Sequence, residues 1–425
     1  MKHLELHILQ SVPVTCLNRD DLGSPKTAFF GGVQRARVSS QSWKRAIREY
    51  AHEISPYFEG KRSRLIIEPL QDELVKLGKS EEEALEAAKS IGLVIGKLDA
   101  KAENKGLFRV KTVHYTSKSE LKAIAELFIQ QLGELDNNPL IEKVNKLKDA
   151  QNADDDQKKK IVKEIKTLDK KISSVGQKAV KTIGAGVLKD AADLALFGRM
   201  VANDHSLTIE GAAMFNHPIS THKVDNELDF FAAVDDWQKE GESGAGMTGT
   251  LEFNSSVYYR FAALNLDMLA NKKHLACMTI DERKEVVSAF VQATLEAVPG
   301  MTASNSGRKN SMNGYTRPSY VLGIIREKGH PIQFVNAFEE PVWSGSGRGI
   351  MKASIEKLQK EEKQQNKIWK LDKEQVLRVS IEAVSVDTKE SLENWKKTNA
   401  ENKKEDISED LDIEGFIKEL VNYVA

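Results

Sequence analysis

The sequence predicts an α+β fold in which one sheet domain is interrupted by two insertions. Alternating apolar residues predict strands and apolar residues at helical spacing predict helices. The elements predicted for the sheet domain are, in order, strand 4–10, helix 39–53, strand 195–201, strand 255–266, helix 279–298 and strand 320–325. A helical stretch at 56–181 and a glycine-rich segment at 222–251 interrupt this series, which predicts an inserted lobe and a protruding hairpin.

The composition indicates a soluble protein of several parts. A chain of 425 residues exceeds the roughly 250–300 residues at which single cores stop growing. Hydrophobic residues make up 40% and charged residues 29%, as in globular proteins. No apolar run is long enough for a membrane span, and the N-terminus lacks the apolar core of a secretory signal. Two distant cysteines, Cys16 and Cys277, suit a reducing compartment, so we expect a cytoplasmic protein without membrane contact.

The first residues of the sheet domain have a clear strand pattern. Leu4, Leu6 and Ile8 alternate with polar residues, as in a strand with one buried face. The glycines between 23 and 32 predict a loop with little regular structure. The complete order of strand, helix, strand, strand, helix and strand is that of ferredoxin-like folds, which include the RNA-recognition folds. Because this fold serves many functions, the order alone does not decide the function.

The stretch at 56–181 predicts helices throughout. Ser80 with Glu83, and Ser117 with Glu120, have the spacing of capping boxes that open apolar-periodic segments. Farther on, apolar residues recur on both sides of a polar turn at 152–156, which predicts an antiparallel helical hairpin.

Every charged residue between Leu22 and Arg48 is basic, although the whole chain has a net charge of −1. These residues are Lys26, Arg35, Arg37, Lys44, Arg45 and Arg48. Ser39, Ser40 and Gln41 begin the predicted helix, and a helix N-terminus suits a phosphate because its amides are unpaired and its partial charge is positive. The stretch therefore predicts contacts to a nucleic-acid backbone. A solvated basic helix face is the alternative interpretation.

The hairpin segment offers aromatic and acidic residues. Phe230 and Phe231 point to opposite faces of a strand, so one of them could stack on a base, unless both belong to the core. The carboxylates either are solvated or bind Mg²⁺ for phosphodiester cleavage: Asp225, Glu227, Asp229, Asp235 and Asp236. Their spacing matches no metal-site pattern, and His217 and His222 form no convincing zinc pair. We therefore expect neither a metal nor another cofactor.

Five ordered blocks resemble one known family. The first block lies between Cys16 and Arg48 and contains CLNRDD, FGG and RARVSSQSWKRAIR. The others are 195–200 (ALFGRM), 219–236 (ISTHKVDNELDFFAAVDD), 252–266 (EFNSSVYYRFAALNL) and 336–339 (NAFE). Together they resemble CasC, the Cas-seven-type backbone subunits of type I-E CRISPR Cascade complexes. The tail from about residue 393 has no counterpart in this pattern.

The resemblance implies a hand-like molecule with a ferredoxin-like, RRM-like palm, an inserted helical fingers domain and a β-hairpin thumb. It divides the chain into palm 1–55, fingers 56–181, palm 182–221, thumb 222–251, palm 252–345 and a C-terminal helical extension at 346–425. The lysine-rich hairpin near 149–171 is longer than the family pattern, which leaves the role of the fingers open.

The resemblance also implies a structural subunit without catalytic activity. Several copies would polymerise along one CRISPR RNA, the thumb would interrupt base stacking at regular intervals, and the exposed bases would pair with target DNA. The implied partners are CRISPR RNA, target DNA by way of the guide, neighbouring copies of the chain and other Cascade subunits. The implied RNA-binding residues are Arg19, Lys26, Arg35, Arg37, Ser39, Ser40, Gln41, Lys44, Arg45, Arg48, Arg199, Met200, Phe231, Arg308 and Lys309. Met200 and Phe231 would lie near the displaced base.

Two other functions stay open at this point. A metal-dependent ribonuclease of the same superfamily would cut complementary RNA through the thumb aspartates Asp235 and Asp236. A helical interaction scaffold would bind no nucleic acid, and its basic stretch would only solvate a surface. RNA binding at low salt separates the scaffold from the other two, because phosphate contacts are strongest there.

Overall fold

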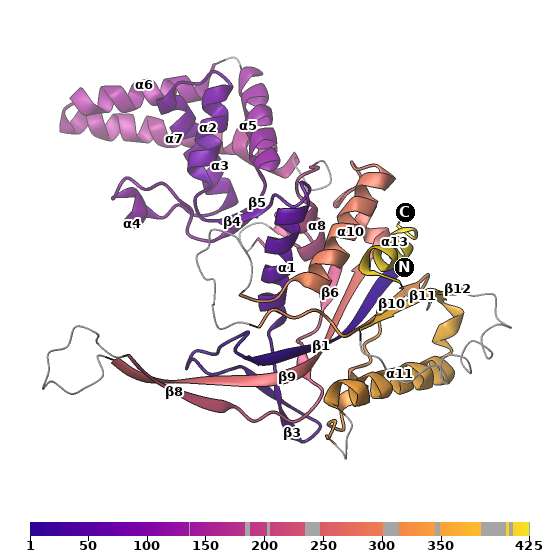
Figure 1. Cartoon of the computed structure of the whole chain (residues 1–425). Coiled ribbons are helices and arrows are strands. Elements are labelled where there is room, and N and C mark those ends of the chain that lie inside the picture. The colour runs from indigo at the N-terminus through magenta and orange to yellow at the C-terminus, as the bar shows by residue number, and fades with distance from the viewer. Residues whose placement is uncertain are drawn as a thin grey trace, which may run out of the picture. The chain divides into compact units, whose positions relative to one another are not determined.

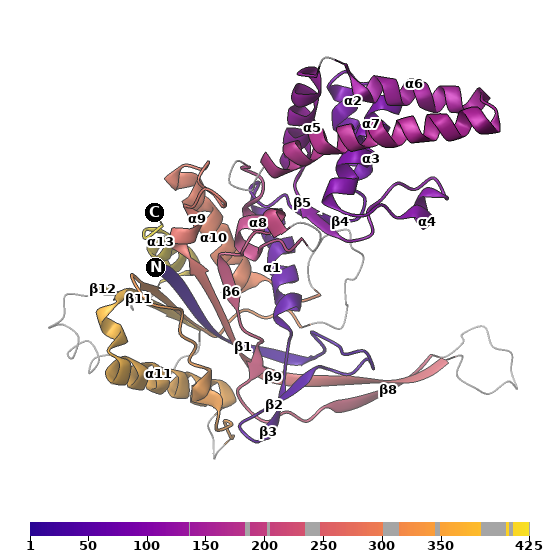
Figure 2. The ribbon, with the colours of Figure 1, turned by 180° about the vertical axis from the view of Figure 1, so that it is seen from behind.

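The chain folds into two compact units (Figures 1 and 2). The computed structural model describes residues 1–135, 137–182, 188–201, 205–233, 247–300, 314–344, 349–383, 405–407 and 411–424. Unit 1 comprises Met1–Ser55, Ala213–Asp267 and Ile280–Ala425. Unit 2 comprises Pro56–Ala212 and Met268–Thr279. Each unit has its own hydrophobic core.

Unit 1 is built on one large sheet with the order β12-β11-β10-β1-β9-β6. Its strands are β1 (His3–Thr15), β6 (Ala213–Phe215), β7 (Ile219–Ser220), β9 (Met247–Asn265), β10 (Tyr320–Arg326), β11 (Gln375–Glu382) and β12 (Glu405–Ile407). β1 lies antiparallel between β9 and β10, and β6 is antiparallel to β9. The strands β10-β1-β9-β6 thus have the ferredoxin-like order of fourth, first, third and second strand. The predicted α+β fold class is confirmed.

Helices cover both faces of this sheet (Figure 1). They are α1 (Ser40–Ile54), α9 (Leu266–Leu269), α10 (Ile280–Glu296), α11 (Ile350–Trp369) and α13 (Ile413–Val421), with the short 3₁₀ turns η3 (Val335–Phe338) and η4 (Leu371–Lys373). α1, α10 and α13 lie on one face, and α11 with η3 lies on the other. On the α11 face, Tyr259 and Phe261 of β9 pack with Leu322 of β10 and with Ile355 and Leu358 of α11. The sheet is therefore the middle layer of three.

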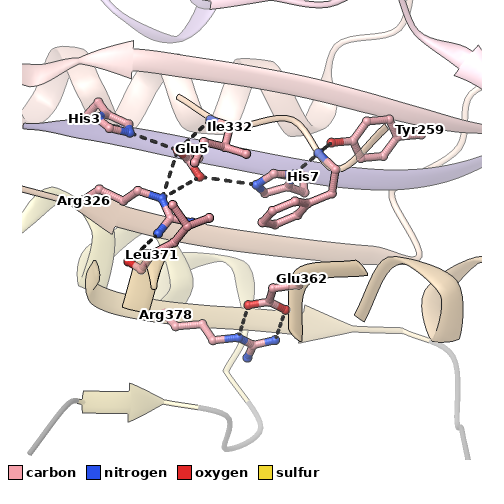
Figure 3. A network of polar contacts seen from close by, with 10 residues as sticks. His3, Glu5, His7, Tyr259, Arg326, Ile332, Glu362, Leu371 and Arg378 are labelled. Carbon is pink, nitrogen blue, oxygen red and sulfur yellow. Dashed lines mark hydrogen bonds and ion pairs between the residues drawn. The ribbon is translucent and has the colours of Figure 1, made fainter. Parts of the chain in front are cut away.

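A buried polar network lies within unit 1, on the α11 side of β1 (Figure 3). Glu5 is completely buried, and its Oε1 contacts His3 Nε2 at 2.9 Å and Arg326 Nε at 3.2 Å. The Ile332 N–H donates to the same oxygen at 3.0 Å. Burial by itself raises the pKa of Glu5, but the contacts with His3 and His7 and the charge of Arg326 outweigh it and lower the pKa to about 2. Glu5 is therefore a buried carboxylate stabilised by compensating partners.

Two predicted elements of the sheet domain are wrong. The segment at 23–32, predicted to be a loop, supplies β2 (Thr27–Phe30), which pairs with β3 (Val33–Ala36) around a turn at Gly31-Gly32. Both glycines have positive φ angles, which favours a tight turn over an irregular loop. The segment at 195–201, predicted to be a strand, begins in helix α8 (Ala192–Phe197) and continues as a turn at Gly198. Ala195 and Leu196 are completely buried, and such short apolar runs do not distinguish a helix from a strand.

Unit 2 is mainly helical. It contains β4 (Lys61–Ser63), α2 (Ile67–Lys76), α3 (Glu81–Ile95), α4 (Ala100–Glu103), β5 (His114–Thr116), α5 (Lys118–Gly133), α6 (Pro139–Asn152), α7 (Asp155–Thr182), α8 and η2 (His205–Leu207). Ser80 and Glu83 form the predicted capping box of α3, and α6 packs on α7 as the predicted helical hairpin (Figure 2). Across the described residues of both units, no helix is long and apolar enough to cross a lipid bilayer.

The C-terminal segment returns to the sheet of unit 1. β11 pairs with β10, so the region at 346–425 contributes a strand where only a helical extension was expected. The amphipathic stretch near the end forms α13, whose Phe416 and Leu420 are completely buried. A Cβ atom added at Gly323 of β10 would lie 3.0 Å from side-chain atoms of both residues. Gly323 therefore provides the space in which α13 docks on the sheet.

We expect Phe416→Ala to lower the free energy of unfolding by about 3–5 kcal/mol, because the truncated side chain leaves a cavity between α13 and the sheet. Urea denaturation followed by circular dichroism measures the change. Lys418→Ala on the exposed side of the same helix is the control and should leave the midpoint nearly unchanged. Equal midpoints for the two variants would show that α13 does not stabilise unit 1.

Candidate nucleic-acid interface

Backbone hydrogen bonds hold the basic stretch beside the start of α1. The Lys26 N–H donates to the Asn18 carbonyl at 2.9 Å, and the Arg37 N–H donates to the Lys26 carbonyl at 2.8 Å. The Asn18 side-chain oxygen in turn accepts from the Ser39 N–H at 3.0 Å. Lys26 and Arg37 are thereby fixed next to the residue that precedes α1.

The charges of three of the predicted cations act on His217. The Ser40 N–H donates to His217 Nδ1 at 3.0 Å, which places the ring at the first residue of α1. Burial, followed by the positive charges of Arg37, Lys44 and Lys26, lowers the pKa of His217. Three separate cations oppose the protonation of this ring. The ring therefore lies in a region of positive electrostatic potential. This role of His217 could not be predicted from the sequence, where its spacing from His222 suggested only a poor zinc pair.

The N-terminus of α1 adds to this positive potential. The hydroxyl of Ser39 makes no capping hydrogen bond, and the first turn contains no acidic residue. Gln41 is exposed in that turn. Below it, the buried Trp43 packs under the Arg260 guanidinium, whose carbon lies 3.7 Å from the ring centroid. The helix start is thus fixed on the sheet while its outer side has the properties of an anion site.

The next turns of α1 present further cations. Lys44 Nζ lies 5.5 Å from the centroid of the Phe215 ring. Arg45 is exposed, and its Nε lies 2.7 Å from Glu49 Oε1 one turn along the helix. Exposed pairs of this kind contribute only about 0.3–0.5 kcal/mol, so Arg45 can exchange Glu49 for a phosphate at little cost. Arg48 is half-buried on the same helix.

We expect the pKa of His217 to rise when an anion occupies this site, because a bound phosphate offsets the cations that lower it. Titration of the histidine Cε1 proton signals by NMR, with and without a short single-stranded RNA, measures the shift. His222 is the internal control, since its pKa is lowered by burial and by the charge of the buried Arg35, and not by the cations beside His217. A pKa of His217 unchanged by RNA would place the anion elsewhere.

Two predicted contacts, Arg35 and Arg19, have other roles in the structure. Arg35 has no exposed surface, and its guanidinium donates to the carbonyls of Ser220 at 3.0 Å and Phe338 at 2.7 Å. Arg19 Nη1 donates to the Glu252 carbonyl at 3.2 Å and so ties the loop to β9. A guanidinium surrounded by backbone acceptors positions the chain and has few donors left for a phosphate. We therefore exclude both arginines from the proposed contact set.

The predicted hairpin is formed by β8 (Glu227–Ala233) and the first half of β9, which extend away from the sheet (Figure 1). Phe231 lies opposite Gly249, where an added Cβ would come within 2.6 Å of the Phe231 ring. The ring therefore covers the glycine and is half-buried. Phe230 on the other face is 69% exposed, as is typical of a contact residue and not of a core residue. The family resemblance implied Phe231 as the base contact, and Phe230 is the more exposed of the two rings.

In unit 2, Arg199 and Met200 differ completely in exposure. Arg199 is buried, and its Nη1 lies 2.7 Å from Glu120 Oε1. Gly198, with a φ of 76°, leaves no room for a Cβ beside the Ile209 carbonyl. Met200, directly after this rigid turn, is 83% exposed. Arg199 therefore holds the turn in place, and Met200 is the residue that it presents.

Some of the remaining candidate residues cannot be placed in the site. Arg308, Lys309, Asp235 and Asp236 lie outside the described residues. Within the described part, no group of three or more His, Cys, Asp or Glu side chains is close enough together to hold a metal ion. The ring of His222 accepts from the Val257 N–H at 3.3 Å, so this ring is part of the backbone hydrogen bonding.

Comparison with known proteins places this geometry in a family. The model of the family described as CT1975-like protein matches residues 4–409. The chain belongs to the CT1975-like protein family. The match includes the basic stretch and hairpin of unit 1 as well as the Met200 turn of unit 2.

Two solved structures share the fold of this CT1975-like protein over its whole length. One is described as "CRISPR RNA-guided surveillance complex, pre-nicking", with a TM-score of 0.71, 24% identity and 100% of both chains covered. The other is described as "CRISPR RNA-guided surveillance complex", with a TM-score of 0.60, 20% identity and 99% of both chains covered. No curated protein sequence matches the chain. At these identities the structures establish the fold of the CT1975-like protein.

Proposed function

We propose that the chain is a structural, CRISPR RNA-binding backbone subunit of a Cascade surveillance complex, of the CasC kind found in type I-E systems. The observation that carries the proposal is the placement of Lys26 and Arg37 beside Ser39, at the start of α1, with Lys44 in the next turn of that helix. The same fold occurs in chains described as parts of CRISPR RNA-guided surveillance complexes. Membership of the CT1975-like family agrees with this assignment.

The proposed phosphate contacts all lie at the start of α1 and on its exposed side. Charged side chains supply affinity without sequence preference, which a subunit that binds any guide requires. The partial positive charge of the helix N-terminus adds to their attraction for one phosphate. The proposed contact set is Lys26, Arg37, Ser39, Ser40, Gln41, Lys44, Arg45 and Arg48.

The proposed base contacts are made by the hairpin and by Met200. Phe230 and Phe231 on β8 offer aromatic faces, and stacking on such a face stabilises a bound base by roughly 1–3 kcal/mol. In this proposal the hairpin interrupts the stacking of the guide at regular intervals, and Met200 contacts a displaced base. The bases between hairpins then pair with target DNA, so base pairing supplies the specificity.

The proposal includes several copies of the chain on one guide RNA, together with the other subunits of the complex, in the cytoplasm. It assigns the chain no catalytic step and no cofactor. The described carboxylates of the hairpin, Asp225, Glu227 and Asp229, are exposed and form no metal cluster with other described residues.

An electrophoretic titration of the purified chain against a labelled single-stranded RNA of about 60 nucleotides tests this proposal. The expected result at 50 mM salt is a ladder of shifted bands, because successive copies add along one strand, and the ladder should weaken steeply by 200 mM salt. The absence of any shift at 50 mM salt would contradict the proposal and support an interaction scaffold without nucleic acid.

A further inference from the structure

A second cationic surface lies in unit 2, on the loop between α3 and β5. The two arms of this loop pair through a β-bridge between Leu98 and Val110. The Asp99 N–H donates to the Arg109 carbonyl at 2.9 Å, and the Lys111 N–H donates to the Lys97 carbonyl at 2.7 Å. The short helix α4 forms the tip, which lies apart from the other helices of the unit (Figure 1). We name this segment, residues 97–111, the basic loop.

The acidic residues of the basic loop are already neutralised. Asp99 Oδ2 lies 2.6 Å from Arg64 Nη2 and 3.1 Å from Arg109 Nε. Glu103 Oε1 lies 3.2 Å from Lys89 Nζ. These ion pairs leave an excess of positive charge on the loop, because its lysines are not part of them.

The lysines of the loop face solvent around a depression. A hollow of about 710 Å³ is lined by Lys101, Ala102, Asn104, Lys105, Leu107 and Arg109. Neither Lys101 nor Lys105 has a carboxylate partner within 4.0 Å among the described residues, and both are exposed. Lys97 and Lys111 are exposed on the adjoining arms. The loop therefore presents a row of cations without counter-charges of its own.

The residues that line this hollow indicate which class of ligand it binds. Pockets for small molecules enclose their ligand and are lined mainly by apolar and aromatic groups. This hollow is open, its lining is about equally polar and apolar, and Leu107 is an exposed apolar residue between the cations. Protein partners are typically anchored by buried aromatic residues, and none lines this hollow. A row of exposed cations of this kind is typical of a surface that follows a phosphodiester backbone.

We infer that the basic loop is a second nucleic-acid contact of this chain, in which Lys101 and Lys105 bind backbone phosphates. The inference adds a surface on unit 2 to the guide site proposed for unit 1. It concerns different residues, so the two sites can fail or succeed separately. The phosphates belong either to duplex DNA that meets the complex or to a single strand of RNA.

The test compares the full chain with the double variant Lys101→Gln and Lys105→Gln. Binding of a labelled 30-base-pair DNA duplex and of a single-stranded RNA is measured by fluorescence anisotropy between 50 and 200 mM salt. Loss of two phosphate contacts should reduce the slope of log affinity against log salt by about 1.8 for the duplex or about 1.4 for the single strand. The probe whose slope changes identifies the source of the phosphates.

The matched control is Lys118→Gln with Lys122→Gln, which removes the same charge from exposed positions on α5 of the same unit. This control should keep the wild-type slopes. Equal slopes for wild type and the basic-loop variant, or equal losses in the two variants, would overturn the inference. It would also be overturned if the basic-loop variant kept its nucleic-acid affinity but lost a companion subunit on size-exclusion chromatography, since the loop would then bind protein. Retention of RNA by the Lys101/Lys105 variant in the electrophoretic titration separates this site from the one at α1.

Discussion

Replacing Lys26 and Lys44 together with glutamate is expected to weaken guide RNA binding by about 100-fold or more. Both lysines lie close enough to His217 to lower its pKa, so both contribute to the positive potential at the start of α1. Each contact between a cation and a phosphate is a charge-assisted hydrogen bond worth about 1.5–3 kcal/mol, and reversal of the charge adds repulsion. The loss should be measured as the change in dissociation constant for single-stranded RNA at fixed salt.

The control for this experiment is Lys360→Glu with Lys363→Glu. Both residues are exposed on α11, so this variant has the same net charge but leaves the α1 site intact. It should bind RNA nearly as tightly as the wild type. If both variants lost affinity equally, only the total charge would matter, and the phosphate site at α1 would be disproved.

Glu5→Gln is expected to lower the free energy of unfolding by about 3–5 kcal/mol. The substitution leaves the Arg326 guanidinium in the interior without its carboxylate, and an uncompensated buried charge is strongly destabilising. The effect should be measured by chemical denaturation at neutral pH. Glu340→Gln, which removes one exposed partner of Lys357, is the control and should have little effect. Similar stabilities for the two variants would show that the network in Figure 3 does not stabilise the palm.

The effect of Glu5→Gln on the free energy of unfolding should depend on pH. The pKa of Glu5 is lowered from 4.5 to about 2, so the unfolded chain takes up this proton first as the pH falls. The contribution of Glu5 to stability is therefore complete above pH 4.5 and is lost progressively between pH 4.5 and pH 2. The difference in unfolding free energy between the wild type and Glu5→Gln should shrink over that range.

The sequence predicted those elements that are determined by side chains within one or two helical turns. The capping box at Ser80 and the N-terminus of α1 at Ser39 are set by side chains within one turn, and the structure has both helix starts where the sequence placed them. The helical hairpin of α6 and α7 follows from apolar spacing on both sides of a polar turn. The ferredoxin-like order was predicted with a wrong second strand, because β6 and not the segment at 195–201 occupies that place in the sheet.

What the sequence could not show depends on contacts between distant segments. Arg35 belongs to the basic stretch, but it is buried because Ser220 and Phe338 close over it from far along the chain. His217 joins the site because β7 brings it beside α1. Glu5 occupies a position that the alternation of β1 assigned to solvent, but α11 covers that face of the sheet. In each case the sequence shows a charged or titratable residue, but it does not show which distant residues surround that side chain.

The proposed function requires that this chain binds a guide RNA. Its most direct test is to coexpress the chain with a CRISPR array and the companion subunits encoded beside it, purify the assembly through a tag on this chain, and sequence the retained RNA. We expect protected RNA of uniform length that carries spacer sequence, and its loss from the Lys26→Glu, Lys44→Glu variant. Recovery of an intact assembly free of RNA would disprove the proposed function.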